Sequence, residues 1–319
     1  MKKFISFFLL IGLFYISSAQ DSLDYLIASK ADSVEIKLWK IGGIGAIAVS
    51  QVSLTNWAAG GQNSLSGNAR LNLFANYKKN NSTLENTFDL GYGFVRQGPM
   101  NTRKSDDKID FTSKYGRKAS KLWYYSGLIN LKTQMFPGYK YPNDTVRISN
   151  FFAPAYIVTS IGMDYKPDDY LTLLLSPLTG KITIVFNREL ADAGAFGVKK
   201  AVYDIIGNRI TPGENLRYEF GGYLKMIYKK DLMENVFLQT KLDLFSNYVD
   251  KPLNIDISWE ILITMKVNKY ISASLISHLV YDDDIDVKID DDRDGVIDYI
   301  GPKVQFKEVL GIGFSYKFN

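Results

Sequence analysis

The sequence predicts an all-β fold, an antiparallel transmembrane barrel of the outer-membrane type with about 12 strands. Three observations support this prediction. Long segments alternate between apolar and polar residues, the chain opens with an export signal, and no later apolar run approaches the length of about twenty residues that a membrane helix requires. Strands that cross a membrane must close into a barrel, because lipid cannot satisfy the hydrogen bonds of an open sheet edge.

The export signal occupies residues 1–19. Lys2 and Lys3 precede an apolar stretch over residues 4–16, and small residues lead up to Ala19. This is the pattern of a secretory signal peptide that is cleaved after Ala19, with an uncleaved membrane anchor as the alternative.

Residues 20–38 follow as a periplasmic N-terminal segment or plug, and the barrel is expected over residues 39–319. The N-terminal segment mixes acidic and apolar residues, which fits a short helix, a plug in the lumen or a docking tail. Alternation predicts strands, in chain order, near residues 43–54, 65–77, 84–94, 105–116, 123–135, 155–165, 169–187, 216–228, 236–248, 253–267, 271–281 and 304–319.

These strands differ in how clearly the pattern marks them. The first is rich in glycine, the fourth is weak, and the seventh is interrupted by proline. The strand over residues 253–267 alternates throughout, whereas strands of globular proteins typically span about five or six residues. The closing strand places Phe306, Leu310 and Phe314 on one face and small or polar residues such as Gly311 and Ser315 on the other. Such length and polarity favour a lipid-facing wall.

The links between strands give an independent indication of the membrane orientation. Short turns are expected at 79–82, 117–119, 166–168, 229–231 and 268–269. Longer loops are expected at 55–63, 98–104, 136–151, 188–214 and 283–302, and the link near 250–252 is short. Outer-membrane barrels have short periplasmic turns and longer extracellular loops, so both ends of the barrel are predicted to lie in the periplasm.

Composition excludes several classes of protein. The chain has no cysteine, so a disulfide scaffold, a thiol nucleophile and a cysteine-ligated metal are excluded. Without Lys2 and Lys3 the charges nearly balance, and nothing indicates a nucleic-acid partner. The 21 tyrosines and 19 phenylalanines are typical of the aromatic girdles of membrane barrels.

Several short motifs resemble one known family. Asn56-Trp57-Ala58-Ala59-Gly60-Gly61 is the most distinctive of them, and the others lie at residues 106–108, 176–181 and 290–301. Together they are similar to an uncharacterised outer-membrane β-barrel family of Bacteroidota, a domain of unknown function. The resemblance implies the cell outer membrane and a barrel, and it implies no activity, ligand or catalytic residue.

The sharpest local motif is an acidic loop that predicts a calcium site. Asp290, Asp292, Asp294 and Asp298 occupy positions 1, 3, 5 and 9 of a loop with Gly295 at position 6, a spacing that can wrap hard oxygen ligands around one ion. The glutamate expected at position 12 is missing, so other ligands are needed. The candidates are Asp282, Asp283, Asp284 and Asp286. A solvated acidic loop without metal is the alternative.

The strand pattern also assigns many charged side chains to the lumen. They are Arg70, Glu85, Asp89, Lys132, Arg217, Glu219, Lys225, Lys241, Asp243, Asp256, Glu260 and Lys266. Twelve strands enclose a narrow interior, so these charges are expected either to pair into a network that blocks the pore or to line a selective passage.

The sequence leaves three hypotheses for the function of the protein. The first is a non-enzymatic scaffold or accessory subunit of an envelope assembly, suggested by the lumenal charges and by the unusually apolar loop 188–214, which is expected either to fold over the mouth or to meet another envelope protein. The second is a narrow small-solute channel. The third is a lipid-modifying enzyme, for which His278 is the only histidine; it is predicted to face the lumen beside Ser272 and Ser274, and no orienting partner is evident. Outer-membrane lipid is the expected surrounding in every case.

Overall fold

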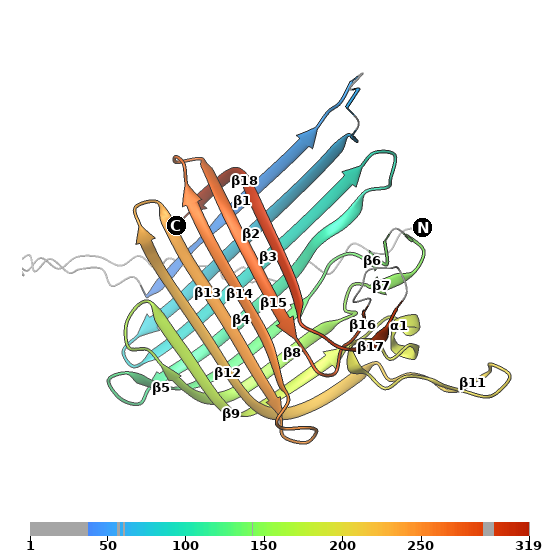
Figure 1. Ribbon diagram of the computed structural model, residues 1–319. Helices are drawn as coiled ribbons and strands as arrows, with labels where there is room; N and C mark the ends of the chain where they lie inside the picture. The colour runs from blue at the N-terminus through green and yellow to red at the C-terminus, as the bar shows by residue number, and fades with distance from the viewer. Residues whose placement is uncertain (1–37, 56–57, 60, 142, 290–296, 319) are drawn as a thin grey trace, which may run out of the picture. The chain divides into compact units, whose positions relative to one another are not determined.

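The computed structural model describes residues 38–55, 58–59, 61–141, 143–289 and 297–318, so residues 1–37, with the predicted signal peptide and nearly all of the 20–38 segment, lie outside the described part. Residues 37–319 form one compact unit. In it, twelve antiparallel strands close into a single barrel, which confirms the predicted fold (Figure 1). The barrel strands are β1 (Trp39–Val52), β2 (Ser64–Lys79), β3 (Ser82–Gln97), β4 (Arg103–Lys118), β5 (Trp123–Thr133), β8 (Ala155–Tyr165), β9 (Leu171–Ile184), β12 (Leu216–Met233), β13 (Val236–Asn247), β14 (Ile255–Lys266), β15 (Ile271–Tyr281) and β18 (Gln305–Phe318).

Every strand pairs with its neighbours along the chain, and β1 pairs with β18 to close the wall. Glycine explains how these two strands meet. A Cβ atom on Gly313 would lie 2.1 Å from the carbonyl oxygen of Ile47, and one on Gly42 would lie 2.9 Å from that of Phe318. The glycine-rich composition of β1 therefore serves the close approach of backbones at the seam.

The barrel is apolar outside and charged inside. Ile161, Leu310 and Phe314 on the outer face are 68%, 68% and 71% exposed, whereas charged groups such as Asp106, Lys114 and Asp164 are buried in the interior. This is the reverse of a water-soluble protein. It is the arrangement that hydrocarbon outside and a polar lumen inside require.

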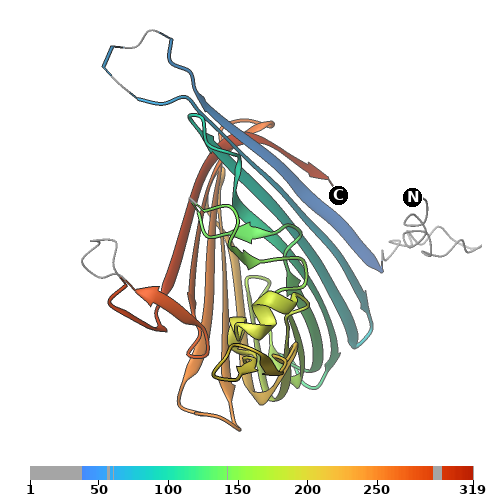
Figure 2. The same ribbon diagram turned by 90° about the vertical axis from the view of Figure 1, so that its right-hand side faces the viewer.

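The connections alternate in length as the sequence predicts. Short turns such as Asn80–Asn81 join strands at one end. The loops at the other end carry small elements that the alternation did not reveal (Figure 2). They are β6 (Gly138–Tyr139), β7 (Arg147–Ser149), α1 (Arg188–Asp192), the 3₁₀ turn η1 (Ala195–Gly197), β10 (Val202–Tyr203), β11 (Arg209–Thr211), β16 (Asp286–Ile289) and β17 (Tyr299–Pro302). No helix among the described residues is long and apolar enough to cross a membrane.

The loop over residues 188–214 divides into two parts that behave differently. Its first part, α1 and η1, is held at the barrel end by a small apolar core of Ala153, Val185, Leu190, Ala191 and Val198. Its second part is the β10–β11 hairpin, which projects away from the barrel (Figure 1). At the hairpin tip Ile205 is 104% exposed and Ile206 78% exposed. The first half of the loop therefore folds against the barrel end, as one of the two alternatives predicts, and the second half leaves its apolar side chains exposed.

Candidate functional site

The lumen holds several groups of ion pairs. Eleven of the twelve lumenal charges predicted from the sequence have an opposite charge within 4.0 Å. The twelfth, Lys266, is exposed at the end of β14 and forms no ion pair with another described residue. The prediction that lumenal charges pair with each other is therefore confirmed for the strands' interior positions.

Two of these pairs cross the lumen between opposite walls. Lys108 Nζ on β4 lies 2.9 Å from Glu260 Oε2 on β14, and Lys241 Nζ on β13 lies 2.9 Å from Asp89 Oδ2 on β3. In the closed order of twelve strands, β4 and β14 are six strands apart in either direction, and so are β13 and β3. Direct contact between opposite walls means that side chains bridge the lumen at this level.

The carboxylate of Asp243 forms further ion pairs between strands. This carboxylate lies 2.8 Å from Lys225 Nζ on the adjacent strand β12 and 3.1 Å from Lys132 Nζ on β5, four strands away. The Tyr223 hydroxyl donates a third bond to the same carboxylate. The Asp243 and Lys225 side chains are only 13% and 10% exposed. One buried carboxylate therefore neutralises two ammonium groups, of which that of Lys225 is buried and that of Lys132 is partly exposed.

A second group of charges connects the remaining strands. Asp106 on β4 binds both Arg70 on β2, at 2.8 Å, and Lys307 on β18, at 2.7 Å. Lys114 binds Asp164 at 2.6 Å and Glu85 at 3.1 Å, and Lys166 binds the same two carboxylates. Strands from all around the barrel are thus tied together through its interior.

Several members of this network were not named from the sequence. They are Asp106, Lys108, Asp110, Lys114, Asp164, Lys166, Lys181 and Lys307. On β4 the signal was present, because Asp106, Lys108, Asp110 and Lys114 all occupy even positions while apolar Ile109 and Phe111 occupy odd ones. The strand looked weak because charges on its odd positions, such as Asp107, obscured this alternation.

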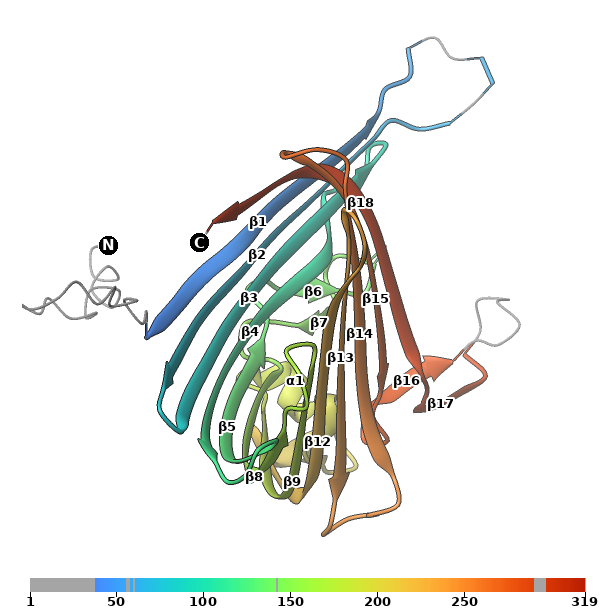
Figure 3. The same cartoon turned by 90° about the vertical axis from the view of Figure 1, so that its left-hand side faces the viewer.

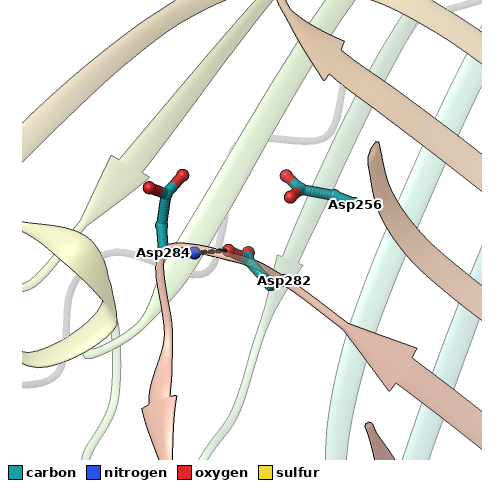
Figure 4. Close-up of side chains that lie close together, drawn as sticks. All are labelled: Asp256, Asp282 and Asp284. Atoms are coloured by element: carbon teal, nitrogen blue, oxygen red, sulfur yellow. Dashed lines mark hydrogen bonds between the residues drawn. The ribbon is translucent and has the colours of Figure 1, made fainter. Parts of the chain in front are cut away.

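At the extracellular end, three aspartates lie close enough to hold a metal ion. Asp256, Asp282 and Asp284 each offer an oxygen within 4.8 Å of the others (Figure 4). Cations of the protein already contact this group, however. Lys181 Nζ lies 2.6 Å from Asp256 and 3.7 Å from Asp282, and Arg217 pairs with Asp284. Any ion here must therefore compete with the Lys181 ammonium.

The predicted calcium loop is only partly within the described residues. Asp290, Asp292 and Asp294 lie outside them, whereas Asp298 is described, just before β17. Of the four additional ligands considered, Asp282 and Asp284 belong to the aspartate group, while Asp283 turns to Lys251, whose Nζ lies 2.9 Å away.

His278 faces the lumen, as the strand pattern predicts. Its Nε2 lies 3.0 Å from the hydroxyl of Ser258 on β14, rather than from Ser272 or Ser274 on its own strand. Cross-strand register places it directly opposite Glu260 on one side and Lys307 on the other. The Ser258–His278 pair therefore borders the ion pair that crosses the lumen, on the face turned away from lipid.

Asp192 fixes the base of the projecting hairpin and gives it a pH dependence. The Gly213 amide donates to its carboxylate at 2.8 Å and Arg209 at 2.6 Å, and these contacts hold the pKa of Asp192 below its usual value of 3.8. A lowered folded pKa contributes stability that is present above the unfolded value and is lost as pH falls through the folded value. We expect the protection factor of the Gly213 amide, which corrects for the intrinsic exchange rate, to fall below about pH 4, and an Asp192→Ala variant to lose this protection at every pH. A protection factor that stays constant through this pH range in the parent protein would contradict this role of Asp192.

These observations decide what kind of protein this is. Its strands are arranged in the order of a closed barrel, its outer face is apolar, and its charges lie in the lumen. The chain is an integral outer-membrane β-barrel protein.

Comparison with known proteins finds a similar family and similar solved structures. The family model "Protein of unknown function (DUF3078)" matches residues 49–139, a stretch that includes the Asn56–Gly61 motif. The resemblance to a barrel family of unknown function is thereby confirmed over this part of the chain. No curated relative matches the chain.

Solved outer-membrane barrels are among its structural neighbours. An outer membrane channel from Pseudomonas putida F1 is 11% identical, with a TM-score of 0.38 and with 87% of this chain and 94% of that chain covered. The translocator domain of the autotransporter NalP from Neisseria meningitidis is 9% identical, with a TM-score of 0.34 and 86% of each chain covered. The NanC porin is 7% identical, with a TM-score of 0.35 and with 86% and 98% covered.

Proposed function

We propose that this barrel is a non-enzymatic scaffold or accessory subunit of an outer-membrane assembly. The observation that carries the proposal is the direct pairing of opposite walls through Lys108–Glu260 and Lys241–Asp89. Ion pairs that cross the lumen narrow the path that solutes could take, which makes transport the weaker alternative. The feature of such a barrel that is available for function is its surface, which can bind other proteins.

The projecting β10–β11 hairpin supports the same role. Ile205 and Ile206 form an exposed apolar patch at the loop tip, and exposed apolar patches mark sites of protein contact. The hairpin is anchored by Arg209–Asp192 at 2.6 Å, so its tip is held away from the barrel instead of collapsing onto it. A partner of the envelope that covers Ile205 and Ile206 would remove them from water.

Removing the apolar tip is therefore expected to release a partner. Ile205→Asp/Ile206→Asp should abolish the stoichiometric co-purification of an envelope protein from gently solubilised membranes of the native host. The matched control is Leu253→Asp, because Leu253 is 93% exposed in the β13–β14 loop and lies outside the hairpin. Co-purification that is equally lost in both variants, or that is absent from the parent protein, would count against the proposal.

Calcium is proposed as a stabiliser of the extracellular end. The acidic loop lacks its last ligand, and Asp282 and Asp284 precede it in the chain, so both are expected to contribute. We expect calcium, and not magnesium at equal concentration, to raise the thermal midpoint of the purified barrel. Asp292→Ala/Asp294→Ala and Asp282→Asn/Asp284→Asn should each abolish this gain, and Glu214→Gln, an exposed acid elsewhere, should keep it. An unchanged midpoint in the parent protein would exclude the calcium site.

The enzymatic alternative is the weakest of the three. The Ser258–His278 pair lies in the lumen, whereas an enzyme that modifies lipid must present its nucleophile where lipid can reach it. Hydrolysis of lipid that disappears in a His278→Ala variant would reverse this order of preference.

A further inference from the structure

The closing seam of the barrel is paired over only part of its length. β1 and β18 are in register from Gly43 opposite Phe318 to Ala48 opposite Gly313. Beyond this point β18 turns away from β1 and is joined only to β15 (Figure 3). Residues 305–312 of β18 therefore have one edge that pairs with no strand in the described part of the chain.

This free edge lies where the wall faces hydrocarbon. The outward side chains of Phe306, Leu310 and Ile312 are 63%, 68% and 65% exposed, and they continue the apolar outer face of β15. Unpaired backbone groups in hydrocarbon are strongly unfavourable, which is why membrane barrels close completely. Lipid chains cannot supply the missing hydrogen bonds.

A second, independent feature lies on the same eight residues. Glu308 points outward from the middle of this segment, between Phe306 and Leu310, and is exposed. It lies opposite Ser277, and the remaining outward positions of β14 and β15 carry no charge. A charge on the lipid-facing side of a barrel is unfavourable, and Glu308 forms no ion pair with another described residue. A Lys or Arg supplied from outside would neutralise it.

The chain itself offers a poor match for this edge. Continuing the present register would bring Val49 and Gln51 of β1 toward the outward positions of β18, and neither is a cation. A second copy would bring the same β1 edge, because an antiparallel partner of β18 must run in the direction of β1. Both the free backbone edge and the unpaired carboxylate therefore indicate a different chain.

We propose that residues 305–312 of β18 bind an extended segment of another envelope protein, which adds to the barrel wall as an antiparallel strand and places a Lys or Arg against Glu308. This inference rests on the proposed scaffold role and names the surface that it uses within the membrane. The hairpin tip and the β18 edge are then two separate contacts, one outside the bilayer and one inside it.

Site-specific photo-crosslinking in the native host tests this proposal. A photoreactive residue at Leu310 is expected to form one discrete protein adduct, whose crosslinked peptide contains a Lys or Arg. The matched control is Ile263, which faces outward in the same cross-strand row but lies two strands away from the edge. Glu308→Lys should reduce the adduct about tenfold or more, because like charges facing each other across an interface oppose binding.

Other outcomes identify other occupants and overturn the proposal. They are an adduct of twice the chain mass, adducts with lipid alone, or an adduct that Glu308→Lys leaves unchanged. A Val49→Cys/Ile312→Cys variant checks closure of the seam on itself, since the chain has no other cysteine, and complete disulfide formation in the membrane would also overturn it. If crosslinking fails while co-purification through Ile205 and Ile206 persists, the proposed binding of a strand at the β18 edge is wrong, and the proposed scaffold role is unaffected.

Discussion

Truncating Lys108 and Lys241 together is expected to turn a barrel that does not conduct ions into one that does. These two side chains span the lumen to Glu260 and Asp89 on the opposite walls. In a Lys108→Ala/Lys241→Ala variant the bridges are gone, and the two carboxylates that remain will draw water and cations into the space. Planar-bilayer recordings should show discrete, cation-selective conductance steps.

The complementary variant provides the control for this prediction. Asp89→Ala/Glu260→Ala removes the same two bridges but leaves the lysines, so its conductance should be selective for anions. Restoring the pair in reversed order, with Lys108→Glu and Glu260→Lys, should reduce conductance again. If both truncated variants stayed silent while correctly folded, the cross-lumen pairs would not be what closes the barrel.

Removing the carboxylate of Asp243 is expected to have the largest effect on stability. Asp243→Ala leaves the Lys132 and Lys225 ammonium groups facing each other, the latter only 10% exposed, without their shared counterion. Breaking a buried ion pair by removing one partner costs about 3–5 kcal/mol. Urea unfolding in lipid vesicles should therefore show a loss of this size in the free energy of unfolding.

An exposed pair of the same chemistry serves as the comparison. Glu214 lies 3.8 Å from Lys199, with side chains 58% and 74% exposed, and such pairs contribute about 0–1 kcal/mol. Glu214→Ala should therefore unfold almost like the parent protein. Equal losses in the two variants would show that the interior is as wet as the surface, which would contradict a closed lumen.

Most of the barrel could be predicted from the sequence, because each wall residue faces either hydrocarbon or the polar lumen. Hydrocarbon outside and charges inside impose a period of two. This period is clearest in β14, where Asp256, Ser258 and Glu260 alternate with Ile257, Trp259 and Ile261. The small extracellular hairpins β6–β7, β10–β11 and β16–β17 were not predicted, because strands of two to four residues are too short to show a period.

The sequence predicted which charged side chains face the lumen, but it did not predict which of them pair with each other. Alternation placed Lys241 and Asp89 in the interior, but their contact joins strands on opposite walls and residues 152 positions apart. Nothing local in the sequence sets such a distance, since it depends on how twelve strands close. The free edge of β18 was hidden for the same reason, and Glu308, which interrupts the apolar outer face of this strand, was not recognised from the sequence.

Single-channel recording of the unmodified barrel in planar bilayers tests the central claim most directly. Heat-dependent migration in SDS gel electrophoresis shows that the protein is folded. The folded protein is expected to insert without producing conductance steps at any voltage that the bilayer withstands. Stable open steps in the parent protein, of the kind expected only after Lys108 and Lys241 are truncated, would contradict a lumen closed by opposing ion pairs.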